Sequence, residues 1–265
     1  MIIFSLNTVL PHVVRTAKNA GEFIRKERLK FTPDKIEMKG LNDMVSYVDK
    51  GAEQMIVAEL REILPEAGFM VEEDSAKEKK EYNWIVDPLD GTTNFIHGIP
   101  CYAVSIALEH KGEIILGVVY EVAKKECFSA YKGGGAFLNE APIKVSANKS
   151  LSESLIGTGF PIYNFDRQEN YLNVLRELMQ KTHGVRRIGA AAADLCYLAS
   201  GRLDAFYEYN LNPWDVAAGV LIIKEAGGTV CDFKGEQNWL YGKEIIATNG
   251  WVEREFMQLV QKHFN

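Results

Sequence analysis

The stretch Trp84–Pro100, WIVDPLDGTTNFIHGIP, passes directly from apolar residues to aspartates, a glycine and threonines. Its first three residues predict a short buried strand, because they are apolar, two of them are β-branched, and a turn signal follows. Asp87 then falls at the carboxyl end of the strand, where sheet enzymes place their ligands. Pro88 favours extended geometry at Asp87, and we expect the following turn to bring Asp90 back beside Asp87.

Two carboxylates held together at a buried turn repel each other unless a cation lies between them. Hard oxygen ligands at this density favour Mg²⁺ or Mn²⁺ over zinc. Gly91 allows close approach of the backbone, and Thr92, Thr93 and Asn94 are residues that cap a helix and leave amide N–H groups free, which attracts phosphate. The alternative is structural: a strand, a turn and a capped helix in which the aspartates are only turn residues.

Length and composition predict an ordinary globular protein. With 265 residues and 47% hydrophobic content the chain can bury a substantial core. A formal charge of −6 argues against broad electrostatic binding of nucleic acid or of an anionic membrane. The four cysteines lack C-x-x-C spacing, and neither a basic signal-peptide start nor a run of about 18 apolar residues is present. We therefore expect a soluble cytoplasmic protein with reduced thiols.

Helix and strand patterns alternate along the whole chain and predict a mixed α-β fold. Three β-rich runs at 101–109, 113–122 and 126–131 predict an antiparallel meander. The polar, turn-prone segment 147–152 suggests a boundary, with residues 1–150 forming an N-terminal α+β half and residues 151–265 a C-terminal α/β half.

Three acidic residues outside the central stretch stand where a strand ends or a helix begins. Glu72 follows the apolar strand 69–71, and the alternative is that Glu72, Glu73 and Asp74 form a solvated acidic patch. Such a patch needs no apolar strand to position its first carboxylate, so we favour Glu72 as a metal ligand and Glu73 as its neighbour. Asp49 and Asp215 stand near predicted helix starts, where a carboxylate also has a structural role as a cap.

The string D-P-L-D-G-T-T at Asp87–Thr93 resembles the signature of the inositol monophosphatase family of Mg²⁺-dependent phosphatases. W-D-V-A-A-G at Trp214–Gly219, followed by E-A-G-G, is similar to the family's second signature, and weaker similarity covers Asp43–Asp49 and Glu72–Glu73. The resemblance extends over essentially the whole chain. It implies a layered α-β-α-β-α sandwich of the inositol monophosphatase and fructose-1,6-bisphosphatase type, usually assembled as a homodimer.

The resemblance also implies a mechanism with two or three Mg²⁺ ions, Mn²⁺ being compatible, in which metal-activated water attacks a small phosphate ester directly. The implied ligands are Glu72, Asp87, the Leu89 carbonyl, Asp90 and Asp215. Glu72 and Thr92, the latter oriented by Asp49, would position and deprotonate the water. The sequence departs from the family pattern at Val71, where glycine is usual, and in the loop that carries Lys39.

The substrate contacts implied by the resemblance come from both halves. Backbone amides at the start of the D-G-T-T helix would bind phosphate oxygens, while the second half would bind the hydroxyls of a sugar or inositol. The implied substrate-binding residues are Gly91, Thr92, Thr93, Ala190, Ala191, Glu208 and Asp215. Ala190 stands near a position where the family often has Ser or Thr.

Three functions compete. The first is a phosphatase of inositol 1-phosphate. The second is a sugar bisphosphatase acting on fructose 1,6-bisphosphate, with Arg167, Arg186 and Arg187 as candidate cationic contacts, or a phosphatase of 3′-phosphoadenosine nucleotides. The third is a non-catalytic partner-binding protein that retains the fold.

Overall fold

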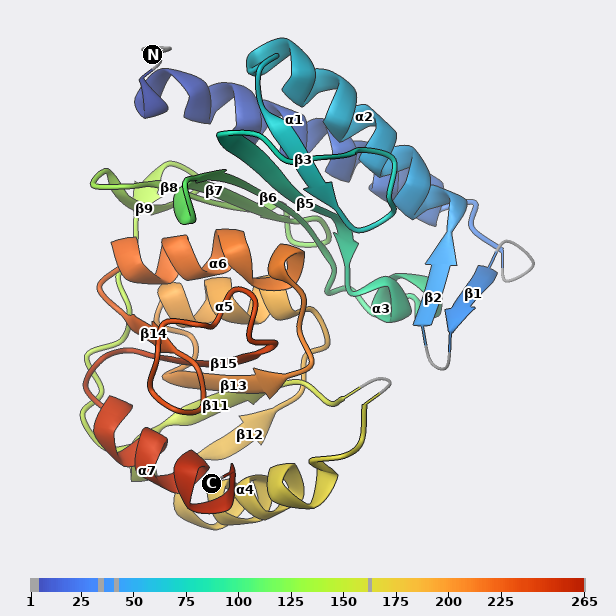
Figure 1. Cartoon of the computed structure of the whole chain (residues 1–265). Coiled ribbons are helices and arrows are strands. Elements are labelled where there is room, and N and C mark those ends of the chain that lie inside the picture. The colour runs from blue at the N-terminus through green and yellow to red at the C-terminus, as the bar shows by residue number, and fades with distance from the viewer. Residues whose placement is uncertain (1–4, 33–35, 41–42, 162–163, 265) are drawn as a thin grey trace.

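Five layers of helices and sheets alternate through the molecule (Figure 1). The computed structural model describes residues 5–32, 36–40, 43–161 and 164–264. The helices are α1 (Leu6–Arg28), α2 (Tyr47–Ile63), α3 (Thr92–His97), α4 (Gln168–Lys181), α5 (Ala191–Ala199), α6 (Pro213–Glu225) and α7 (Glu253–Phe264), with a 3₁₀ turn at Leu151–Glu153.

An eight-stranded sheet contains the stretch from which the sequence analysis began. Its strands, in spatial order, are β10 (Ala141–Pro142), β9 (Gly135–Leu138), β8 (Glu126–Tyr131), β7 (Glu113–Glu121), β6 (Ala103–His110), β5 (Tyr82–Asp90), β3 (Gly68–Val71) and β4 (Lys77–Glu78). The strands β6, β7 and β8 pair antiparallel, which confirms the predicted meander. A small β1 (Ile36–Gly40) and β2 (Asp43–Ser46) hairpin stands beside α3 (Figure 1).

The strands β3 and β5 are parallel, and this pairing positions the site. Val71 lies opposite Val86, so Glu72, directly after β3, and Asp87 of β5 emerge at the same edge of the sheet. The pairing of β5 with β6 becomes irregular between Asp87 and Asp90. The chain therefore bends where the two aspartates stand.

A five-stranded sheet forms the other β layer. Its order is β12 (Gly184–Arg186), β11 (Leu155–Thr158), β13 (Ala205–Tyr209), β15 (Glu244–Thr248) and β14 (Thr229–Cys231). All strands of the larger sheet precede residue 143 and all strands of this one follow residue 154. The division into halves at residues 150 and 151 stays a prediction.

Helices α5 and α6 fill the layer between the sheets, α1 and α2 cover the outer face of the larger sheet, and α4 and α7 cover the smaller one (Figure 1). Every residue of α5 is buried, which fits its alanine-rich sequence. The approach is close: a Cβ on Gly117 of β7 would lie 2.8 Å from the Ala218 carbonyl of α6. The expected α-β-α-β-α sandwich is confirmed. Within the described residues, none of the helices has the length and apolar character needed to cross a bilayer.

Candidate metal and phosphate site

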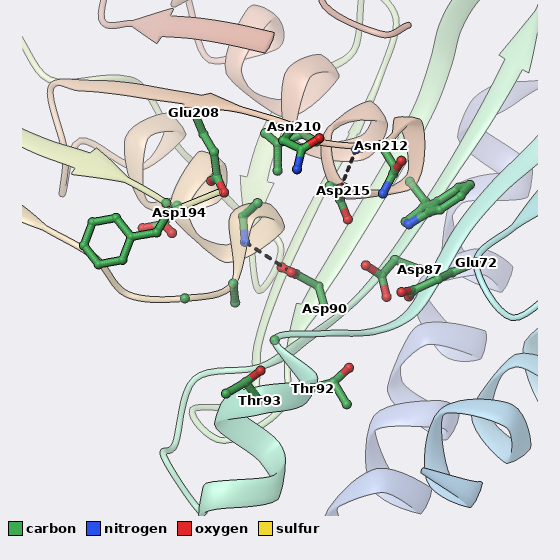
Figure 2. Close-up of a pocket in the computed structure, with 18 of the residues that line it drawn as sticks. Glu72, Asp87, Asp90, Thr92, Thr93, Asp194, Glu208, Asn210, Asn212 and Asp215 are labelled. Atoms are coloured by element: carbon green, nitrogen blue, oxygen red, sulfur yellow. Dashed lines mark hydrogen bonds between the residues drawn. The ribbon is translucent and has the colours of Figure 1, made fainter. Parts of the chain in front are cut away.

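Three aspartates converge at the edge of the large sheet. Asp87 and Asp90 come from the end of β5 and Asp215 from the first turn of α6, and one carboxylate oxygen of each lies within 4.8 Å of the others. Figure 2 shows these side chains facing a common space, with Glu72 beyond Asp87. The structure thus brings together four of the five predicted metal ligands by their side chains, in a cavity of about 320 Å³.

Each carboxylate is held by neighbouring backbone. Asp87 Oδ1 accepts a hydrogen bond of 2.9 Å from the Leu89 amide. Asp90 accepts bonds from the amides of Ala191 (3.2 Å) and Ala192 (2.8 Å) at the N-terminus of α5. Ala190 and Ala191 line the cavity, as expected. The same turn supplies the amides that hold the Asp90 carboxyl group.

The position of Asp215 is compatible with both roles that the sequence left open for it. It is the third residue of α6 and forms a capping box with Asn212, whose amide donates to Asp215 Oδ2 at 2.6 Å. The same carboxyl group belongs to the acidic cluster. Capping therefore fixes the orientation of the side chain toward the pocket.

Burial makes this cluster hard to ionise. It raises the pKa of Asp87 well above its ordinary value, with the neighbouring charge of Glu72 adding to the effect. Burial likewise raises the pKa of Asp90 to about 6 and that of Asp215 well above its usual range. Mutual repulsion in a desolvated site is relieved by a divalent cation, and the all-oxygen donor set suits Mg²⁺ or Mn²⁺. The residues fit the expected metal.

Thr92 connects the metal site to α2. Its hydroxyl oxygen lies 2.9 Å from Asp49 Oδ1 and 2.9 Å from the Leu89 carbonyl oxygen, so its single proton has two possible acceptors. Asp49 is buried, and its Oδ2 accepts the Ser46 amide at 2.8 Å within a capping box. The hydrogen bond between Thr92 and Asp49 that the resemblance implies is thus present, and Asp49 also takes part in capping α2.

Gly91 is required where the two halves of the site meet. Its φ of +86° is unfavourable for other residues, and a Cβ would lie 3.1 Å from Ala190 Cβ and 3.2 Å from the Cys101 carbonyl. Gly91 is the N-cap of α3, and neither Thr92 nor Thr93 supplies a side-chain cap, contrary to expectation. The first backbone bond of α3 runs from Phe95 N to Gly91 O, so the amides of Thr92 and Thr93 precede the helical ladder.

Glu53 is a buried carboxylate that the sequence analysis did not single out. It accepts hydrogen bonds from the amides of Glu73 (2.6 Å) and Ser75 (2.8 Å), and so anchors the loop that carries Glu72. The available signal was its spacing: Glu53 follows Asp49 by one turn of α2, on the face that packs inward.

Only some of the other residues predicted for the site line the cavity. Glu208 lines the same cavity on the side away from Glu72. Of the three candidate arginines, only Arg187 lines the cavity; Arg167 pairs with Glu244, and Arg186 is exposed on β12. The side chain of Lys39 lies outside the described residues. Val71, the departure from the family pattern, is fully buried in the core under α2.

Comparison with known proteins agrees with this architecture. The sequence profile of the inositol monophosphatase family matches residues 5–264. An inositol-1-monophosphatase from Mesorhizobium japonicum is 42% identical over 258 residues, covering 97% of each chain. A protein named Nus factor SuhB from Pseudomonas aeruginosa is 43% identical over 264 residues, again covering 97% of each. The crystal structure of extragenic suppressor protein suhB from Bartonella henselae superposes with a TM-score of 0.91 at 41% identity, over 95% of this chain and 98% of that one.

Proposed function

The chain belongs to the inositol monophosphatase family, and on this premise we propose that it is a Mg²⁺-dependent phosphomonoesterase that hydrolyses inositol 1-phosphate to inositol and phosphate. One observation carries the proposal: the cluster of Asp87, Asp90 and Asp215 shares a cavity with the Thr92 hydroxyl and the start of α3. Cation ligands, a water-positioning hydroxyl and phosphate-binding amides are therefore within one site.

In this proposal Glu72, Asp87, Asp90, Asp215 and the Leu89 carbonyl would hold the metal. Bound Mg²⁺ would supply an activated water and stabilise the departing alkoxide. The Thr92 hydroxyl, by donating its proton to Asp49, directs an oxygen lone pair into the cavity, where it accepts a hydrogen bond from the attacking water. Glu72 takes the water's proton.

The phosphate end of the substrate lies against α3. Amides of Gly91, Thr92 and Thr93 donate to phosphate oxygens, and the partial positive charge of the helix start adds to that attraction. Asp215 and Glu208 accept hydrogen bonds from hydroxyls of the leaving group. Ala190 and Ala191 shape the wall between them and offer no side-chain hydrogen bond.

Among the alternatives, the bisphosphatase function receives support from a single cationic side chain in the cavity, that of Arg187. A partner-binding role receives support from the relatives named Nus factor SuhB. The complete set of acidic ligands favours catalysis over both a purely structural and a purely partner-binding role. We also propose that the protein forms a homodimer. The net charge of −6 supports the proposal that it binds no nucleic acid. The four buried free cysteines support a location in the reducing cytoplasm.

The test is Asp90→Asn, which keeps the size of the side chain and one of the two oxygens that accept amides of α5, but removes the charge of a proposed ligand. Turnover of inositol 1-phosphate at saturating Mg²⁺ should fall at least ~10²-fold with the circular dichroism spectrum unchanged. Asp166→Asn, at an exposed position outside the cavity, is the matched control and should retain wild-type turnover. Near-normal activity of Asp90→Asn would refute the proposed function.

A further inference from the structure

Two successive turns at the start of α2 face the site. Asp49, in the first turn, accepts the Thr92 hydroxyl at 2.9 Å. Glu53 follows four residues later, so both side chains lie on the same inward face of the helix. In the proposed mechanism Glu72 and Thr92 position the attacking water. Helix α2 thus holds Thr92 through Asp49, and the contacts of Glu53 connect the same helix with the segment that carries Glu72.

Glu53 is fully buried, which is uncommon for a carboxylate. Each of its oxygens accepts one backbone amide: Oε2 accepts that of Glu73 at 2.6 Å, and Oε1 accepts that of Ser75 at 2.8 Å. Burial of a carboxylate is costly unless it is hydrogen-bonded, and hydrogen bonds to a charged acceptor are stronger than those between neutral groups. Both oxygens of Glu53 are therefore committed to the loop that follows β3.

That loop has the shape of an anion-binding turn. Asp74 has a φ of +62°, in the left-handed region that residues other than glycine seldom adopt. A left-handed residue between the amides of Glu73 and Ser75 turns both N–H groups to one side, and such a concave pair of amides binds an anion. The Glu53 carboxylate is the anion that both amides bind here.

Glu72 is held by backbone contacts on both sides. Its own amide donates to the Val86 carbonyl at 3.3 Å, which continues the pairing of β3 with β5. The next amide along the chain, that of Glu73, is bound by Glu53. Figure 2 shows the Glu72 side chain beside Asp87 at the edge of the acidic cluster. Fixing the backbone around a residue limits where its side chain can lie, so the contact at Glu53 bears on a proposed metal ligand.

We propose that Glu53 is a positioning residue for Glu72, and that α2 thereby sets the separation between Glu72 and Thr92. Asp49 holds Thr92 and Glu53 holds the Glu72 loop from consecutive turns of one rigid helix. The inference rests on the proposed phosphatase function and extends it. Without the Glu53 carboxylate the loop amides lose their acceptor, and Glu72 is no longer fixed where it binds the cation.

Glu53→Gln tests the proposal, because it keeps the length of the side chain and replaces one acceptor oxygen by an NH₂ group, which cannot accept an amide. Binding of Mn²⁺, as a probe for the Mg²⁺ site, is measured on the substrate-free protein by electron paramagnetic resonance. We expect the dissociation constant to rise roughly 10- to 100-fold. In chelator, hydrogen exchange at the amides of Glu73 and Ser75 should become faster.

Glu59→Gln is the matched control. Glu59 lies on the same helix and also accepts two hydrogen bonds, but these come from α1: from Thr16 Oγ1 at 2.7 Å and from Asn19 Nδ2 at 3.0 Å. Its replacement should leave Mn²⁺ binding at the wild-type value.

Glu53→Asp is the second variant, and it carries the test should Glu53→Gln fail to fold. It keeps the charge on a side chain that is one methylene shorter and does not reach both amides. Its dissociation constant for Mn²⁺ should therefore exceed the wild-type value but stay below that of a folded Glu53→Gln protein.

A double-mutant cycle with Glu72→Gln identifies the residue through which Glu53 acts. If Glu53 acts through Glu72, then Glu53→Gln changes Mn²⁺ binding little once Glu72 has been replaced. A general effect of Glu53 on the fold would instead weaken Mn²⁺ binding by the same factor in both backgrounds.

The outcomes separate the two claims. Wild-type Mn²⁺ affinity in a folded Glu53 variant, or an equal loss with and without Glu72, would overturn the role of Glu53 and leave the phosphatase function standing. Wild-type protein that binds no Mn²⁺ and releases no phosphate from inositol 1-phosphate overturns the phosphatase function itself.

Discussion

At the residue scale, two side chains of the site, those of Asp49 and Asp215, each make two kinds of contact. Asp49 caps α2 and binds Thr92, and Asp215 caps α6 and joins the acidic cluster. This is why the sequence is compatible with both a structural and a functional explanation of each residue. Capping fixes a rotamer, and a fixed rotamer is what a metal ligand or a positioning residue requires.

The sequence indicated Asp87 and Asp90 well because their chemistry is local, consisting of a strand end, a proline and a turn within four residues. It did not indicate Asp194, which also lines the cavity, because an aspartate inside an alanine-rich helix carries no local sign of being buried beside a glutamate that follows it by fourteen residues. Glu53 was missed for a similar reason, since its partners are backbone amides on another segment.

Thr92 gives the prediction that belongs to this scale. Thr92→Val keeps the shape of the side chain and removes the hydroxyl, so turnover of inositol 1-phosphate should fall roughly 10²-fold or more, with the Mg²⁺ concentration for half-maximal activity unchanged. Thr92→Ser keeps the hydroxyl and should retain most of the activity. Steady-state kinetics across a Mg²⁺ titration measures both. Equal activities of the Val and Ser variants would remove the hydroxyl from the mechanism.

At the element scale, the pairing of β3 with β5 decides where the ligands meet. The sequence predicted both strands as short apolar runs, and their parallel register then places Glu72 beside Asp87. The order of strands in each sheet could not be predicted this way, because pairing between distant strands depends on tertiary packing rather than on local pattern.

The contacts at the start of α5 likewise could not be predicted from local sequence. Its amides bind Asp90 across about a hundred residues of sequence, and Asn94 of α3 donates to the Ile188 carbonyl just before that helix. The small residues at 189–193 allow close packing. Their amides face a carboxylate only because of the way the layers stack. The two contacts hold the two parts of the cavity together.

At the scale of the whole molecule, the cavity concentrates carboxyl groups whose pKa values are higher in the folded than in the unfolded protein. For Glu208 the pKa rises from 4.5 to about 8, and those of Asp87, Asp194 and Asp215 move in the same direction, all through burial first. A group that binds its proton more tightly when folded stabilises the fold at low pH, and this stabilisation is lost as the pH rises through the folded pKa.

The metal-free protein should therefore become less stable between about pH 4.5 and pH 8, and added Mg²⁺ should offset that loss. The hydrogen bond with Lys262 lowers the pKa of Glu177 to about 2, so Glu177 makes the fold more stable as the pH rises. That change occurs below this pH range. Melting temperatures measured in chelator and in Mg²⁺ across the range check the expectation. A melting temperature in chelator that climbs with pH, or that Mg²⁺ leaves unaltered, would contradict it.

The central claim is tested most directly by phosphate release from inositol 1-phosphate by the wild-type protein, measured side by side with Mg²⁺ and with a chelator. Fructose 1,6-bisphosphate and a 3′-phosphoadenosine nucleotide are the comparison substrates. We predict release from inositol 1-phosphate that requires Mg²⁺, stops on chelation and returns when Mg²⁺ is restored, with slower release from the other two. Release that persists in chelator, or a protein inactive on inositol 1-phosphate at every Mg²⁺ concentration, would contradict the account.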